Sequence, residues 1–169
     1  LAPVLCRYGE LARALPGHGA FIAGDRTLLD YLLQRSKTFE NEIAMPPPIC
    51  AANLAGIDAL ELADAKRKRL LLLADRLAAG LRALGHTLFS AAPSTIVSLH
   101  VASPRLAAEI REGLLERGML VDAIYNIRPR SEQAAIRMLP SVRHKEQDID
   151  ALLEAFEAVT KRAAHPTRS

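Results

Sequence analysis

The chain has no tryptophan, and only 4% of its 169 residues are aromatic. Alanine and leucine supply most of the apolar half of the composition, and this balance favours helices over a β-sandwich or barrel. No apolar run is long enough to cross a bilayer, and the first residues lack the basic and apolar parts of a secretory signal. We therefore expect no membrane span, and one sizeable domain or a small domain with part of another.

Cysteine is also scarce, and the charge is nearly balanced. Cys6 and Cys50 have no metal-ligand spacing and are typical of a protein in a reducing cytosol. The five histidines are scattered without an i,i+4 pair, so we expect no metal site. The formal net charge of +3 is small, and a nucleic-acid binder would concentrate basic residues on one face. The single basic cluster, residues 66–69, lies near acidic residues and is interpreted as a solvated helix face.

The first part of the chain predicts short elements. Residues 1–16 carry a weak helical pattern, and residues 20–23 form a short apolar run that indicates a strand. Asp25 is a suitable N-cap for the helical pattern that follows it. Residues 37–45 are predicted to form a loop.

A long helical pattern occupies the middle of the chain. Three prolines at 46–48 can supply the first turn of a helix, and the pattern then runs through residues 49–84. A helix of that length should bend or break, and polar residues at 62–66 interrupt its apolar stripe. Gly85 is a suitable residue to end it.

In the last part of the chain the spacing of the apolar residues changes. The new pattern predicts a strand–helix–strand–strand–helix order over residues 94–162. This order favours a small α+β domain with its helices on one face of a sheet. The predicted elements are a strand at 95–101, a helix at 104–117 closed by Gly118, strands at 119–125 and 134–139, and a helix from 146 to about 162. Residues 165–169 are expected to be disordered.

Residues 10–24 read ELARALPGHGAFIAG. This stretch resembles the α-oxoamine synthases, which are pyridoxal-phosphate (PLP) enzymes that condense an amino acid with an acyl thioester. The family's matching stretch is Thr-Leu-Ser-Lys-Ala-Leu-Gly, a short loop, and Gly-Gly-Tyr-Val-Ala-Gly-Ser, and its lysine forms the Schiff base with PLP. That position falls on Arg13, whose guanidinium stays protonated and cannot act as the amine nucleophile. An exposed helical arginine beside Glu10 and an anion-binding group in a degenerate cofactor pocket are the two alternatives for Arg13.

Two further positions are predicted from the same resemblance. Residues 38–47, TFENEIAMPP, resemble the family's Phe-Ile-Phe-Ser-Thr-Ala-Leu-Pro-Pro, which puts Glu42 and Ile43 at the Ser-Thr pair. The resemblance implies that a hydroxyl there reaches the PLP phosphate of the neighbouring subunit, whereas a carboxylate would be repelled by it. His18, between two glycines, is a candidate to line the cofactor side of a cleft.

Residues 135–144, AIRMLPSVRH, resemble the family's Arg-Ile-Arg and Ser-Ala-Ala-His-Thr segments. Arg137 falls on the arginine that holds the carboxylate of the amino-acid substrate, and a planar guanidinium suits that contact. A strand arginine in a surface ion pair is the alternative. His144 matches the family's histidine, although capping or packing at the start of the last helix is the preferred interpretation.

The resemblance implies an α/β protein of PLP fold type I that comprises the end of the large domain and a complete small α+β domain. The family's long N-terminal region, with the aromatic residue that stacks on PLP and the aspartate that pairs with its pyridine nitrogen, has no counterpart here. The chain begins with leucine rather than methionine, and truncation is our expectation. The predicted parts are a large-domain remnant at 1–48, connecting helices at 49–92, the C-terminal domain at 93–163 and a tail at 164–169.

These observations predict the C-terminal part of a PLP-dependent transferase that is inactive alone, because Arg13 replaces the Schiff-base lysine. No residue is assigned a catalytic role. The alternative is a non-catalytic partner subunit that supports a lysine-containing homologue, and a decaying gene fragment is a third possibility. Amino-acid and acyl-thioester substrates, a homo- or heterodimer, a cytoplasmic location and no nucleic acid complete the expectations.

Overall fold

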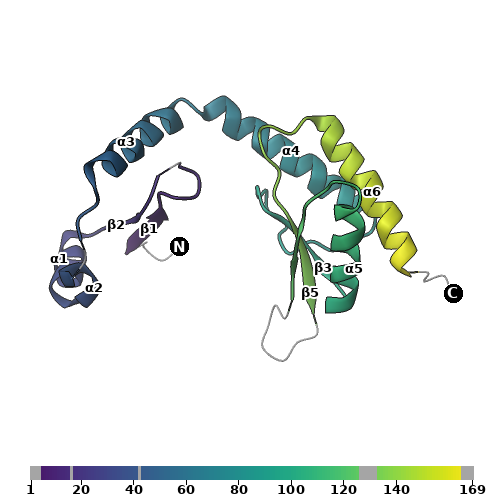
Figure 1. The fold of residues 1–169 in the computed structure, drawn as a ribbon, viewed down its shortest axis with the longest axis horizontal. Coiled ribbons are helices and arrows are strands. Elements are labelled where there is room, and N and C mark those ends of the chain that lie inside the picture. The colour runs from purple at the N-terminus through teal and green to yellow at the C-terminus, as the bar shows by residue number, and fades with distance from the viewer. Residues whose placement is uncertain (1–4, 16, 42, 126–132, 165–169) are drawn as a thin grey trace. The chain divides into compact units, whose positions relative to one another are not determined.

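The computed structural model describes residues 5–15, 17–41, 43–125 and 133–164 (Figure 1). The chain forms two compact units, Leu1–Asp64 and Ala65–Ser169, and their boundary lies inside the stretch that the sequence predicts as connecting helices. The first unit carries the segments that resemble a cofactor site, and the second carries Arg137.

A β-hairpin opens the first unit. Strand β1 (Cys6–Glu10) pairs with β2 (Ala20–Gly24) in antiparallel register, with Gly9 opposite Phe21. The strand predicted at 20–23 is confirmed, and the helical pattern predicted from residue 1 is wrong over β1. Gly9 disfavours a helix and is covered by the Phe21 ring, which would lie 2.5 Å from a Cβ at this position. Pairing with β2 therefore overrides a weak local preference.

Two short helices follow the hairpin. Helix α1 (Arg26–Arg35) begins as predicted at Asp25, whose carboxylate accepts a hydrogen bond from the Thr27 amide at 2.8 Å. Helix α2 (Lys37–Asn41) contradicts the predicted loop. This single turn is closed by local bonds, including one from the Asn41 side-chain amide to the Lys37 carbonyl at 2.8 Å, and a segment this short has no apolar periodicity by which it could be recognised.

The long helical pattern forms two helices. Helix α3 (Pro47–Glu61) starts with proline in its first turn, and α4 (Asp64–Ala83) begins after a break of two residues. Both the proline start and the break within 62–66 are confirmed. Gly85 follows the end of α4 with a φ of 86°, a left-handed conformation that glycine adopts at low cost.

The second unit contains the predicted strand–helix–strand–strand–helix order. Its sheet has the order β3-β5-β4, and both neighbouring pairs are antiparallel. Figure 1 shows α5 and α6 packed along one side of this sheet. The elements are β3 (Val97–Val101), α5 (Pro104–Leu115), β4 (Asp122–Ile124), β5 (Ala134–Met138) and α6 (Glu146–Ala164).

The core of the second unit lies between that sheet and its helices, and α4 contributes to it. Leu77 of α4 and Phe156 of α6 are fully buried. The rings of Phe156 and His86 are nearly perpendicular, with centroids 5.0 Å apart. Burial lowers the pKa of His86 below its ordinary value, because the charged imidazolium loses solvation there.

Candidate functional site

Arg137 is the fourth of the five residues of β5 and lies on the sheet face opposite the core. Its neighbours along the strand, Ile136 and Met138, are buried, and in the register Asp122 of β4 and Ser98 of β3 lie opposite Arg137. The Nε and Nη2 of Arg137 donate to Oδ2 of Asp122 at 3.2 and 2.8 Å. The two side chains are 42% and 47% exposed. Arg137 is therefore ion-paired and still accessible to solvent.

The contact with Asp122 uses one edge of the guanidinium. An arginine side chain presents five N–H donors in a fixed fork, and Asp122 engages the edge formed by Nε and Nη2. Among the described residues, Nη1 of Arg137 donates to no acceptor and Oδ1 of Asp122 accepts from no donor. The distal edge of the fork is consequently available to a second planar acceptor such as a carboxylate.

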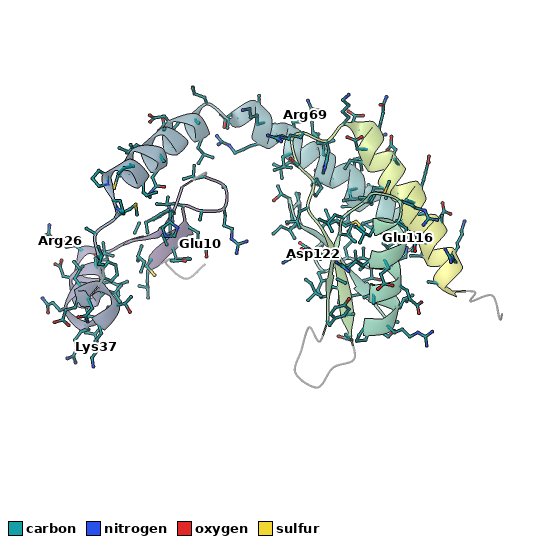
Figure 2. All side chains as sticks on the ribbon, in the orientation of Figure 1. Glu10, Arg26, Lys37, Arg69, Glu116 and Asp122 are labelled. Carbon is teal, nitrogen blue, oxygen red and sulfur yellow. The ribbon has the colours of Figure 1, made fainter. Side chains whose placement is uncertain are left out.

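Arg13 lies in the turn between β1 and β2 rather than in the helix that the sequence analysis considered. Its Nε donates to Oε2 of Glu10 at 3.1 Å, and the Arg13 side chain is 84% exposed. Figure 2 labels Glu10 beside this turn. Arg13 therefore lies beside Glu10, as predicted, and its guanidinium is exposed to solvent.

His18 lies on the same turn, and its backbone is held by a residue that the sequence analysis missed. Asn53 of α3 accepts from the His18 amide through Oδ1 and donates to the His18 carbonyl through Nδ2, both at 3.1 Å. Asn53 is only 6% exposed. Gly17 has no room for a Cβ because Asn53 Oδ1 occupies that space, and Gly19 has a φ of 93°. The two glycines permit this close approach.

We expect Asn53→Ala to lower the stability of the turn by about 1–3 kcal/mol, because the part-buried amide and carbonyl of His18 would both lose their hydrogen-bond partner. Hydrogen exchange should accelerate at the amides of His18 and Gly19. Asn41→Ala is the matched control, since it removes an exposed amide that makes a single hydrogen bond. Equal effects of the two substitutions on exchange in the turn would contradict this role for Asn53.

The other positions predicted from the sequence are Glu42, Ile43 and His144. Glu42 lies outside the described residues, and Ile43 beside it is 94% exposed. The Nδ1 of His144 accepts from the Ser141 amide at 3.1 Å, and its carbonyl accepts from Arg69, which agrees with a local role at the start of α6. The structure thus brings Arg13 and His18 onto one turn, while Arg137 belongs to the other unit.

The described parts of the chain contain no group of three or more His, Cys, Asp or Glu side chains that could hold a metal ion. Over the same residues, every helix is too short or too polar to cross a membrane. Cys6 and Cys50 are both exposed free thiols.

No protein-family model matches the chain, but it has clear sequence relatives. The 8-amino-7-oxononanoate synthase of Marinobacter nauticus is 36% identical over 154 residues, which cover 91% of this chain and 38% of the relative. The synthase of Methylococcus capsulatus is 36% identical over 162 residues, covering 95% and 41%. The chain therefore spans about two fifths of the length of the curated relatives it matches.

Solved structures show the same fold. The 8-amino-7-oxononanoate synthase of Francisella tularensis superposes with a TM-score of 0.83 at 24% identity, covering 95% of this chain and 47% of that chain. The serine palmitoyltransferase of Sphingomonas wittichii superposes with a TM-score of 0.84 at 22% identity, covering 95% and 41%.

The fold is that of the fold type I PLP-dependent enzymes. Within this class the sequence relatives are more specific, and they confirm the resemblance drawn from the motifs. The chain belongs to the α-oxoamine synthase family and corresponds to its C-terminal region.

Proposed function

We propose that the chain is the C-terminal part of a PLP-dependent transferase that joins an amino acid to an acyl thioester. The observation that carries the proposal is the 36% identity to 8-amino-7-oxononanoate synthases over 91% of the chain. Arg137 is the group that would hold the amino-acid carboxylate. Its exposed guanidinium edge and its position on the middle strand of the sheet both suit that task.

The residues at the cofactor side do not fit attachment of PLP. The family's lysine position carries Arg13, whose guanidinium is protonated, solvated and paired with Glu10. Ile43, at the second position of the family's Ser-Thr pair, has no hydroxyl to donate to a phosphate. We therefore propose that this chain alone does not form the Schiff base, and we assign it no catalytic step.

A non-catalytic partner role is the second candidate. It is favoured by the first unit, where large apolar side chains are exposed on the hairpin and helices, a pattern that usually marks an interaction surface. In this role the chain would dimerise with a lysine-containing homologue in the cytoplasm, where its free thiols would stay reduced. The most exposed large apolar side chains of the first unit, on these elements and in the segments beside them, are Leu5, Tyr8, Tyr31, Leu33, Ile43, Leu54 and Leu62.

Borohydride trapping tests both candidates. The purified chain is incubated with PLP, reduced, and mapped by mass spectrometry for phosphopyridoxyl-lysine. We expect none of the five lysines to carry stoichiometric label, because none replaces the missing amine. The experiment is repeated after co-expression with a lysine-containing α-oxoamine synthase. Co-purification, with label confined to that synthase, would support the partner role.

Stoichiometric label on one lysine of the chain alone would contradict the loss of the Schiff base through Arg13. Failure to co-purify would contradict the partner role and leave the transferase-part proposal in place.

A further inference from the structure

The second unit carries two clusters of cations that are distant in the sequence and adjacent in the fold. Residues 66–69 read KRKR in the first turns of α4, and Arg143 and Lys145 precede α6. The Nη2 of Arg69 donates to the His144 carbonyl at 3.1 Å, so the two clusters meet at Arg69 (Figure 2). These six cationic residues are exposed, and together they form the basic edge: Lys66, Arg67, Lys68, Arg69, Arg143 and Lys145.

The acidic residues in the first turns of α6 have other partners. Arg76 of α4 donates to Asp150 through Nε and Nη2, both at 2.8 Å, and to Glu146 through Nη1 at 3.2 Å. A carboxylate oxygen of Asp148 accepts from the Lys145 amide at 2.7 Å. These carboxylates are therefore engaged by Arg76 and by the backbone, and the basic edge presents an excess of positive charge to solvent.

A groove of about 500 Å³, lined mostly by apolar residues, adjoins the basic edge. His144 lines this groove, and its carbonyl is the group that Arg69 contacts. Leu120 and Leu139 also line the groove, and both are exposed. The surface thus presents apolar side chains beside cations. Further lining residues are Met119, Pro140 and Leu152, with Arg117 and Asp148 as the charged ones.

We propose that the basic edge and this groove together form a docking surface for an acidic amphipathic helix of a partner protein. The carboxylates of that helix pair with the cations of the basic edge, and its apolar side chains enter the groove beside Leu120 and Leu139. Recognition of a helix in a groove needs both an apolar floor and a charged rim that sets its orientation. The inference does not depend on the proposed function, because neither Arg13 nor Arg137 belongs to this surface.

The mixture of charges favours a protein over other polyanions. Asp64 and Asp148 lie among the cations, and their carboxylates would be repelled by every phosphate of a nucleic acid or an anionic membrane. A partner helix can instead place a basic side chain opposite each of them. The two clusters contain no Phe, Tyr or Trp on which a base could stack. A single small anion fits the surface less well, because exposed cations are screened by water and salt.

Fluorescence anisotropy with the full chain and labelled synthetic peptides tests the proposal. The probe peptide is three repeats of the heptad Leu-Glu-Glu-Leu-Ala-Lys-Glu, which forms an acidic helix with one apolar face. One comparison peptide replaces every glutamate by glutamine, and another keeps the composition but scrambles the order of the residues. At low ionic strength we expect the probe to bind at least about tenfold more tightly than the glutamine peptide, since several exposed ion pairs act together.

Substitutions on the surface locate the contact. Lys66→Gln combined with Lys145→Gln should weaken binding of the probe at least about fivefold. The matched control is Lys161→Gln combined with Arg162→Gln, which removes the same charge at the other end of α6 and should change the affinity by less than about twofold. Leu120→Gln should weaken the probe at least about threefold and leave the scrambled peptide unchanged, because only the probe places an apolar face in the groove.

Equal affinity of the glutamate and glutamine peptides, equal effects of the two double substitutions, or no binding of the probe would overturn the proposal. Vesicles containing phosphatidylserine and a single-stranded oligonucleotide are tested in parallel. Tighter binding of either one, lost on changing Lys66 and Lys145, would assign the surface to that polyanion instead. If sedimentation shows that the chain alone dimerises and that the same double substitution dissociates the dimer, the occupant is a second copy, and a separate partner is ruled out.

Discussion

Leu77→Ala should lower the free energy of unfolding by about 2–5 kcal/mol, whereas Leu72→Ala on the same helix should change it by less than about 0.5 kcal/mol. Leu77 is fully buried and Leu72 is 70% exposed. Truncating the buried side chain removes apolar contacts and leaves a cavity in the core between the sheet and its helices. The exposed side chain loses contact mainly with water.

Urea denaturation followed by circular dichroism gives both values, and the pair of substitutions controls for helix propensity because both replace leucine by alanine in α4. This experiment asks whether α4 belongs energetically to the second unit, in whose core the structure places Leu77. Equal destabilisation by the two substitutions would contradict that placement.

The second large effect concerns hydrogen exchange. We expect the amides that pair β1 with β2 to exchange at least about a thousandfold faster than those that pair β3 with β5, because the first reflect local opening and the second global unfolding. Both pairs are antiparallel and contain five residues per strand. The first lies in a hairpin without a buried residue, and the second is covered by helices.

An isolated two-stranded hairpin is marginally stable in water, which is the physical basis of this contrast. Exchange measured by NMR or mass spectrometry on the full chain would resolve the two strand pairs. Uniform protection of both pairs would show that the first unit is as stable as the second without further protein, and would contradict our expectation that its apolar surface needs a covering partner.

Several elements could be predicted because their signals are local. Asp25 caps α1 through its own side chain and the amide two residues later, and Gly85 ends a helix through its own φ angle. The outward position of Arg137 follows from strand alternation between two apolar neighbours. The assignment of Arg13 to the family's lysine position likewise rests on the sequence motif, and it stays a prediction on which the expectation about the Schiff base depends.

Other features depend on partners that sequence patterns do not specify. The sequence predicts helix where β1 forms, because the weak local preference there gives no sign of the pairing with β2. Asn53 is a single polar residue in an apolar helix, and its contact with His18 joins residues 35 positions apart. No motif marks it, although a lone polar residue on a buried helix face is a signal worth testing.

The sequence by itself determined the family and the order of elements in the second unit, and it carries the prediction that Arg13 replaces the Schiff-base lysine. These depend on residue identity and on preferences that act over a few neighbouring residues. Only the tertiary structure decided that Asp122 meets Arg137, that Asn53 holds the turn after Arg13, and that α4 contributes to the core of the second unit. Each of these contacts joins distant segments, and strand register and side-chain packing fix them only when the chain is folded.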